Sequence, residues 1–316
     1  MIMNHADHKP RSNRRYIEAE SIGNLAFDSL SVDQEGSVLG LTSRGVFIKT
    51  ENKWLIFLSL ESFRGPLTVN LAMNADSILP ISKDMNLRIT ARQILFPEAD
   101  VVISAKNPLV WRPKPPPAPP LPESERQQRL IVSAKQVLAG EKGIGLGALL
   151  PRLLSLSNQS HPQTPDISPL QANILHLQRE MISSSRLPTS ESLISLLGSG
   201  SGLTPSGDDF VCGVLLALNR WKDLLINGQD LDRLNQLVVE AAYRKTTTLS
   251  ANLIECAALG LADERLIEAL DWLVISREGE PGPIDEMLDW GSSSGVDVFV
   301  GYVIAFSAKG NFATQK

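Results

Sequence analysis

The proline-rich segment Arg112–Pro122 is the feature that most constrains the fold of this chain. Proline fixes φ and lacks a backbone N–H, so neither a helix nor a central strand can run through such a segment. We expect an extended polyproline spacer, with a docking motif for a proline-binding module as the alternative. Because the pattern before the segment is typical of strands and the pattern after it of helices, the segment also predicts a domain boundary.

Residues 16–111 are predicted to form a small β domain, preceded by a disordered tail over residues 1–15. Short runs rich in β-branched and aromatic residues alternate with turn residues, which favours an antiparallel β barrel or sandwich. Ser43-Arg44 and Glu51-Asn52 predict tight hairpins. The expected strands are Ser37–Thr42, Gly45–Lys49, Lys53–Leu58, Leu67–Leu71, Leu87–Thr90 and Asp100–Ser104.

Residues 123–316 are predicted to form a larger all-helical domain, since the apolar period changes to that of a helix after the 112–122 linker. The fold class is therefore α+β. The expected helices are Ser124–Ala139, Ala148–Leu156, Leu170–Ser183, Ser190–Leu197, Gly207–Ile226, Leu231–Tyr243, Thr247–Leu261, Glu264–Ile275, Ile284–Asp289 and Val296–Ser307.

Composition excludes several classes of function. The chain has 43% hydrophobic and 21% charged residues and a net charge of −5, so it lacks the basic excess of a nucleic-acid-binding protein. No apolar run reaches bilayer-spanning length and the N-terminus has no apolar signal region, so we expect a cytoplasmic protein without a membrane partner. The two cysteines and four histidines show no metal-ligand spacing.

A short pattern occurs twice, 88 positions apart, within the helical region. Ser206-Gly207-Asp208-Asp209 and Ser294-Gly295-Val296-Asp297 share Ser, Gly and Asp, and Gly213 and Gly301 extend the match. A serine three residues before an acidic residue and an apolar run resembles a capping box, so each serine is expected to be an N-cap. The cap accounts neither for Asp208 nor for the four glycines between Gly198 and Gly207, which predict close backbone approach to a ligand.

Hydroxyl groups, glycines and free N–H groups at these helix starts can bind an anionic group such as phosphate or a carboxylate. The residues expected to bind substrate are Gly200, Gly202, Thr204, Ser206, Gly207, Thr247, Ser293, Ser294 and Gly295.

Three carboxylates, Asp208, Asp209 and Asp297, are the candidate catalytic residues. They would repel a phosphate unless a cation bridged them, so all three are also candidate ligands of Mg²⁺ if that metal is bound; no other cofactor is indicated. Without a metal, they would accept hydrogen bonds from a neutral amide such as a carbamoyl or ureido group, or act as a general base.

The segments 198–209, 246–250 and 291–297 together resemble the AllH-like family, which includes a subunit of oxamate carbamoyltransferase. The resemblance covers most of the chain and is weaker in the β domain. It implies carbamoyl transfer between oxamate, as oxalurate, and phosphate in allantoin breakdown, with carbamoyl phosphate as a product. It also implies other carbamoyltransferase subunits as partners and a small anionic substrate. The sequence departs from the family at Ser292, where a histidine is expected.

Two other hypotheses remain open at this point. Asp pairs at helix starts in an all-helical domain suggest a metal-dependent hydrolase of the ADP-ribosylglycohydrolase type. Alternatively, the chain is a non-catalytic scaffold subunit whose aspartates only cap helices.

Overall fold

The computed structural model describes residues 14–72, 80–116, 119–140, 145–155, 167–184, 187–226, 230–275 and 282–307. The chain divides into two compact units, Met1–Arg112 and Pro113–Lys316, each with its own core. Most of the expected N-terminal tail, residues 1–13, lies outside the described residues. Arg15, also assigned to that tail, instead begins the first strand.

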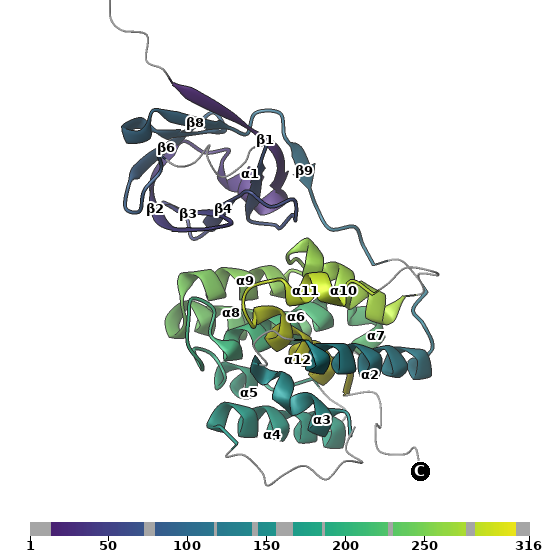
Figure 1. The fold of residues 1–316 in the computed structure, drawn as a ribbon. Coiled ribbons are helices and arrows are strands. Elements are labelled where there is room, and N and C mark those ends of the chain that lie inside the picture. The colour runs from purple at the N-terminus through teal and green to yellow at the C-terminus, as the bar shows by residue number, and fades with distance from the viewer. Residues whose placement is uncertain are drawn as a thin grey trace, which may run out of the picture. The chain divides into compact units, whose positions relative to one another are not determined.

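The first unit is a β barrel, as predicted (Figure 1). Eight strands follow one another in the order β5-β4-β3-β2-β6-β7-β8-β1, and the pairing of β1 with β5 closes the ring. The strands are β1 (Arg15–Gly23), β2 (Gln34–Thr42), β3 (Gly45–Thr50), β4 (Leu55–Ser59), β5 (Thr68–Leu71), β6 (Asn86–Thr90), β7 (Gln93–Phe96), β8 (Val101–Ser104) and β9 (Leu109–Trp111).

The pairing in the barrel is mixed rather than purely antiparallel. β1 pairs with β8 and with the outer strand β9 in parallel, and β4 pairs with β5 in parallel, while the hairpins β2–β3 and β3–β4 are antiparallel as expected. The short helix α1 (Asn24–Ser29) follows β1, and the 3-10 turn η2 (Pro97–Ala99) joins β7 to β8. Apolar side chains such as Ile17, Ile48 and Phe96 fill the interior, so the barrel is a packed core.

The second unit is all-helical among the described residues, as predicted. Its elements are α2 (Glu123–Ala139), the 3-10 helix η3 (Gly145–Leu149), α3 (Leu150–Leu153), α4 (Pro169–Ser184), α5 (Ser190–Ile194), α6 (Ser206–Arg220), α7 (Lys222–Leu225), α8 (Leu231–Lys245), α9 (Thr248–Ala258), α10 (Glu264–Val274), α11 (Ile284–Leu288) and α12 (Ser294–Ser307).

Helices α6 and α12 form the centre of the helical unit, with the other helices around them (Figure 1). Every residue of α6 from Gly207 to Leu218 is buried, and so is every residue of α12 from Gly295 to Ser307. A helix that is apolar on all sides belongs in the interior, because no face of it suits water. The two copies of the repeated pattern therefore open the two most buried helices of this unit.

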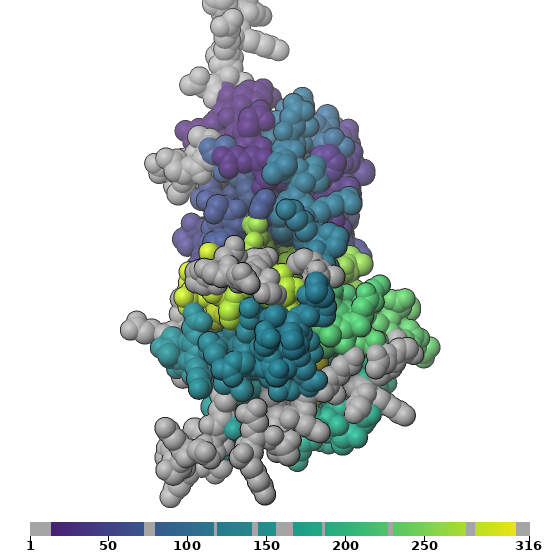
Figure 2. Space-filling view, turned by 90° about the vertical axis from the view of Figure 1, so that its right-hand side faces the viewer, coloured from purple at the N-terminus to yellow at the C-terminus, as the bar shows by residue number. Residues whose placement is uncertain are grey.

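The linker lies against the helical unit rather than acting as a free spacer. Leu121 N–H donates to Val274 O at 2.7 Å, and Pro120 forms a β-bridge with Ile275 at the end of α10. Arg220, the last residue of α6, donates to Lys114 O at 2.9 Å. The following helix α2 (teal) covers much of one face of this unit in Figure 2. Among the described helices, none combines the length and apolar character required to cross a bilayer.

Candidate functional site

The two central helices cross at glycines that occupy equivalent positions of the repeated pattern. A Cβ on Gly213 would lie 2.2 Å from Val298 O, and a Cβ on Gly301 would lie 2.4 Å from Phe210 O. Both contacts involve backbone atoms, which cannot move aside easily. Gly301 is 88 positions after Gly213, and Val298 is 88 positions after Phe210, so the same contact is made twice with the partners exchanged. The crossing is therefore pseudo-twofold symmetric.

The repeated serines and aspartates also pair across the two helices, each serine with the aspartate of the other helix. The Ser206 hydroxyl donates to the carboxylate of Asp297 on α12, and the Ser294 hydroxyl donates to the carboxyl of Asp209 on α6. The prediction that Ser206 is an N-cap is wrong, because Pro205 is the N-cap of α6 and no side chain caps that helix. The pattern Ser-x-x-Asp arises because each serine serves the aspartate of the opposite helix.

Asp208 holds the glycine-rich loop in place. Its Oδ1 accepts the Gly198 N–H at 2.8 Å and its Oδ2 accepts the Thr246 hydroxyl. The side chain is buried. Since both carboxyl oxygens are engaged within the protein, Asp208 joins the loop before α6 to the connection between α8 and α9.

Asp297 is hydrogen-bonded to η3, a segment that the sequence analysis did not assign to the site. Its Oδ1 accepts the Leu146 N–H of η3 at 2.6 Å, and the Ser293 hydroxyl lies 3.5 Å from its Oδ2. Gly145 has a φ of +45°, and a Cβ there would lie 2.4 Å from Asp297 Oδ1. Burial raises the pKa of Asp297, and these hydrogen bonds act against the rise. The closely spaced glycines Gly145 and Gly147 are the sequence signal that points to this segment.

Asp209 differs from both other carboxyls. Its side chain is 2% exposed, and its Oδ2 has no hydrogen-bond partner among the described residues. Burial raises its pKa to about 8, and the nearby carboxylates of Asp297 and Asp208 add to this, while hydrogen bonds from Ser294 and Thr204 lower it. At neutral pH the unliganded protein therefore holds a largely protonated carboxyl at this position.

Two hydroxyl groups lie beside Asp209. Thr204 and Ser294 are half-buried, and their hydroxyl oxygens lie 3.1 Å apart. The exposed residues Gly200 and Gly202 precede them, with φ values of +122° and +97°. A Cβ on Gly202 would meet no atom within 4 Å. The buried carboxyl thus lies beneath half-buried hydroxyls contributed by both helix starts, next to a glycine loop that is open to solvent.

The two glycines of the repeated pattern serve packing. Gly207 and Gly295 are buried, and a Cβ would lie 2.1 Å from Leu196 O or 2.0 Å from Met287 O. Their N–H groups donate to Ser199 O at 2.8 Å and to Trp290 O at 3.0 Å. Protein carbonyls therefore occupy both N–H groups, and the prediction that Gly207 and Gly295 bind substrate stays a prediction.

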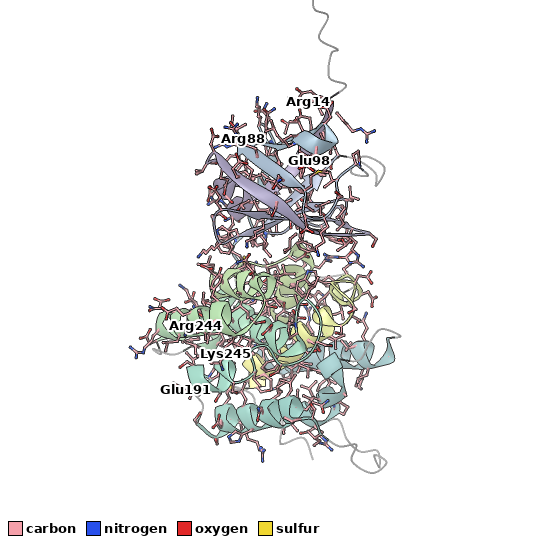
Figure 3. All side chains as sticks on the ribbon, turned by 90° about the vertical axis from the view of Figure 1, so that its left-hand side faces the viewer. Arg14, Arg88, Glu98, Glu191, Arg244 and Lys245 are labelled. Atoms are coloured by element: carbon pink, nitrogen blue, oxygen red, sulfur yellow. The ribbon has the colours of Figure 1, made fainter. Side chains whose placement is uncertain are left out.

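Thr247 stabilises the glycine-rich loop from the side. It is the N-cap of α9, where its hydroxyl oxygen accepts the Ser250 N–H at 3.1 Å and its hydroxyl donates to Leu203 O at 2.7 Å. Lys245 (Figure 3), the last residue of α8, donates to Ile194 O at 3.2 Å. The α8–α9 connection is thus tied both to the loop and to α5.

The structure does not group the three aspartates as ligands of one metal ion among its described residues. In the part of the chain that the structure describes, no three His, Cys, Asp or Glu side chains are placed to hold a metal ion. The reason is visible in their contacts, since Asp208 bonds toward Thr246 and Asp297 bonds toward Leu146. The proposed Mg²⁺ ligand set of Asp208, Asp209 and Asp297 is accordingly not supported.

Comparison with known proteins gives one match. Residues 196–306 match the model of the family described as "Oxamate carbamoyltransferase subunit AllH". The matched segment lies in the helical unit and contains all the residues predicted for the site, so the resemblance is confirmed there, but over a shorter part of the chain than we expected. Ser292, where a family histidine was expected, is exposed in the turn before α12. No curated protein and no solved structure matches the chain.

Proposed function

We propose that this chain is a subunit of an oxamate carbamoyltransferase-type complex and that it contributes a ligand site at the paired starts of α6 and α12. The family match over residues 196–306 supports the assignment to such a complex. The site is supported by one observation above the others: the buried carboxyl of Asp209 has an unused oxygen beneath hydroxyls of both helix starts.

The reaction that the resemblance implies moves a carbamoyl group between nitrogen and oxygen. A phosphate oxygen attacks the carbamoyl carbon of oxalurate, the bond from that carbon to the internal nitrogen breaks, and the nitrogen takes up a proton. The products are carbamoyl phosphate and oxamate. Every substrate and product carries an anionic group, and all of them except phosphate carry an NH₂–C(=O) group.

The chain's own residues fit these two features. The hydroxyls of Thr204, Ser206 and Ser294 donate to Asp209 and Asp297. The starts of α6 and α12 carry the positive ends of two helix dipoles. They would orient the anionic end of a substrate. Asp209 would contact the substrate directly, while Asp208 and Asp297 are positioning residues whose oxygens hold the loop and η3.

Turnover by the assembled complex tests this proposal. Formation of carbamoyl phosphate from oxalurate and phosphate should fall at least about tenfold with Asp209→Ala, which is the usual effect of losing a hydrogen bond to an ionisable group. Asp232→Ala is the matched control, because it removes an exposed carboxylate from α8. Equal turnover of the wild-type complex and the Asp209→Ala complex would refute the assignment of the site.

The scaffold hypothesis makes the opposite prediction in the same assay. It is favoured by the internal use of both Asp208 oxygens and expects Asp209→Ala to leave turnover of an intact complex unchanged. No contact among the described residues favours the metal-dependent hydrolase.

A further inference from the structure

The pseudo-twofold arrangement allows the hydrogen bonds of Asp297 to be compared with those of Asp209, its equivalent in the other half of the site. Asp209 and Asp297 are equivalent residues, each buried, and each accepts a hydrogen bond from the serine of the opposite helix. Beyond that shared bond, Asp297 also accepts the backbone N–H of Leu146 at 2.6 Å. Asp209 Oδ2 accepts nothing from any described residue.

The difference in hydrogen bonding arises because η3 packs against Asp297, and no described segment packs in the same way against Asp209. Gly145 brings the backbone so close to Asp297 that a Cβ would lie 2.4 Å from Oδ1, and this approach delivers the Leu146 N–H. On the α6 side, the loop before the helix carries Thr204, which is half-buried and hydrogen-bonded to Asp209, and Gly202, which is exposed. A buried carboxyl oxygen without a partner costs free energy, so a ligand that supplied the missing donor would be stabilised there.

On the basis of the function proposed above, we propose that Asp209 Oδ2 accepts an N–H from the primary amide of the ligand, the counterpart of the Leu146 N–H on Asp297. The ligand is thus recognised through the NH₂ of an NH₂–C(=O) group. Its anionic end lies toward the helix starts, away from the Asp209 carboxyl, because the helix dipoles favour negative charge there.

An amide NH₂ group differs from a methyl group of equal size because it can donate hydrogen bonds. Pyruvate has the shape and charge of oxamate but carries CH₃ in place of NH₂, and acetyl phosphate stands in the same relation to carbamoyl phosphate. Neither methyl analogue can donate to Asp209. A site built to pair an N–H discriminates strongly against an analogue that lacks it, because the buried acceptor is then left unpaired.

The experiment measures binding of these four compounds to the full chain by isothermal titration calorimetry, for the wild type and for Asp209→Ala. The wild type should bind each amide at least about tenfold more tightly than its methyl analogue. In Asp209→Ala, the affinity for pyruvate should stay within about threefold of the wild-type value while the affinity for oxamate falls to the same level. The retained pyruvate affinity shows that the variant site is folded.

The possible failures are distinct. If amides and methyl analogues bind equally well to the wild type, the amide assignment is wrong although the anion site of the proposed function stands. If the preference for amides survives in Asp209→Ala, another residue accepts the N–H. If none of the four compounds binds, this chain does not itself hold the ligand, and both the proposed site and the amide assignment fall.

Discussion

The starts of α6 and α12 share one sequence pattern, but their aspartates differ in hydrogen bonding. Both begin with Ser-Gly, place an aspartate three residues later and cross at a glycine four residues beyond that aspartate. In the α12 half, η3 supplies the Leu146 N–H and the carboxylate of Asp297 is structural. In the α6 half, Asp209 keeps an unused oxygen and a pKa of about 8. Equivalent positions in one protein thus differ in their hydrogen bonding, with one carboxyl paired to backbone and the other left with an unpaired oxygen.

The difference between Asp209 and Asp297 originates in segments outside the repeated Ser-Gly-x-Asp pattern. The two helices impose a shared geometry on both carboxyls, because each helix is held by the glycine of the other. The asymmetry enters through what packs beside them, which is η3 on Asp297 and the glycine-rich loop with Thr204 on Asp209. A duplicated element alone therefore does not imply a duplicated site.

The strongest test of the comparison is the helix crossing. Gly213→Ala and Gly301→Ala should each lower the free energy of unfolding by about 3 kcal/mol, because both place a Cβ against backbone of the opposite helix. Urea unfolding of the two variants provides the measurement. A large effect at one glycine with none at the other would show that the crossing is not pseudo-symmetric. The alanine variant of the exposed Gly202, whose added Cβ would meet no atom within 4 Å, is the control.

Removal of each carboxyl should have opposite effects on stability. Asp297→Ala leaves the Leu146 N–H buried and unpaired, which should lower the free energy of unfolding by about 2 kcal/mol. Asp209→Ala removes a buried carboxyl with an unpaired oxygen and should leave stability unchanged or raise it. Denaturant unfolding of both variants at pH 7 measures the difference, and equal losses would contradict the distinction between the two halves.

The raised pKa of Asp209 also predicts a pH dependence. The folded-state pKa of about 8 lies above the ordinary aspartate pKa of 3.8, so the folded protein binds an extra proton between about pH 4 and pH 8. Its stability should fall as pH rises through that window, by at most about 1.4 kcal/mol per pH unit from this group. The groups facing it, Asp208 and Asp297, are acidic and strengthen the effect.

Asp209→Asn supplies the comparison for that pH dependence, since the amide does not titrate. The stability advantage of the variant over the wild type should grow from pH 5 to pH 8, measured by urea unfolding at each pH. Parallel curves for the two proteins would show that Asp209 does not carry this proton.

The exchanged serines predict the smallest effect. Ser206→Ala and Asp297→Ala should couple by about 1 kcal/mol in a double-mutant cycle, whereas Ser206→Ala and Asp209→Ala should not couple. A capping box would give the reverse result, because a cap acts within its own helix. Unfolding of the single and double variants decides between them, and the same cycle with Ser294 and Asp209 tests the other half.

Local patterns predicted the elements well where apolar periodicity was strong. The strands at Gly45–Thr50 and Leu55–Ser59 and the helix Glu264–Val274 lie close to their expected places. β1 was missed because charged residues are mixed with apolar ones in Arg15–Gly23, so the segment resembles a polar tail. Only the burial of its apolar side chains in the barrel identifies it as a strand. The expected helix Gly207–Ile226 is interrupted at Trp221, between α6 and α7, next to the buried ion pair of Arg220 with Asp271 at 2.6 Å.

The sequence by itself determined the two-part organisation and marked the repeated Ser-Gly-x-Asp pattern, since period, proline content and short repeats are properties of neighbouring residues. Only the tertiary structure decided how those residues are used. The exchange of serines between helices, the hydrogen bond from Leu146 to Asp297 and the unpaired buried oxygen of Asp209 all depend on contacts between segments far apart in the chain. Such contacts leave no periodic trace in a single sequence, because burial and hydrogen bonding are set by whichever segment packs alongside.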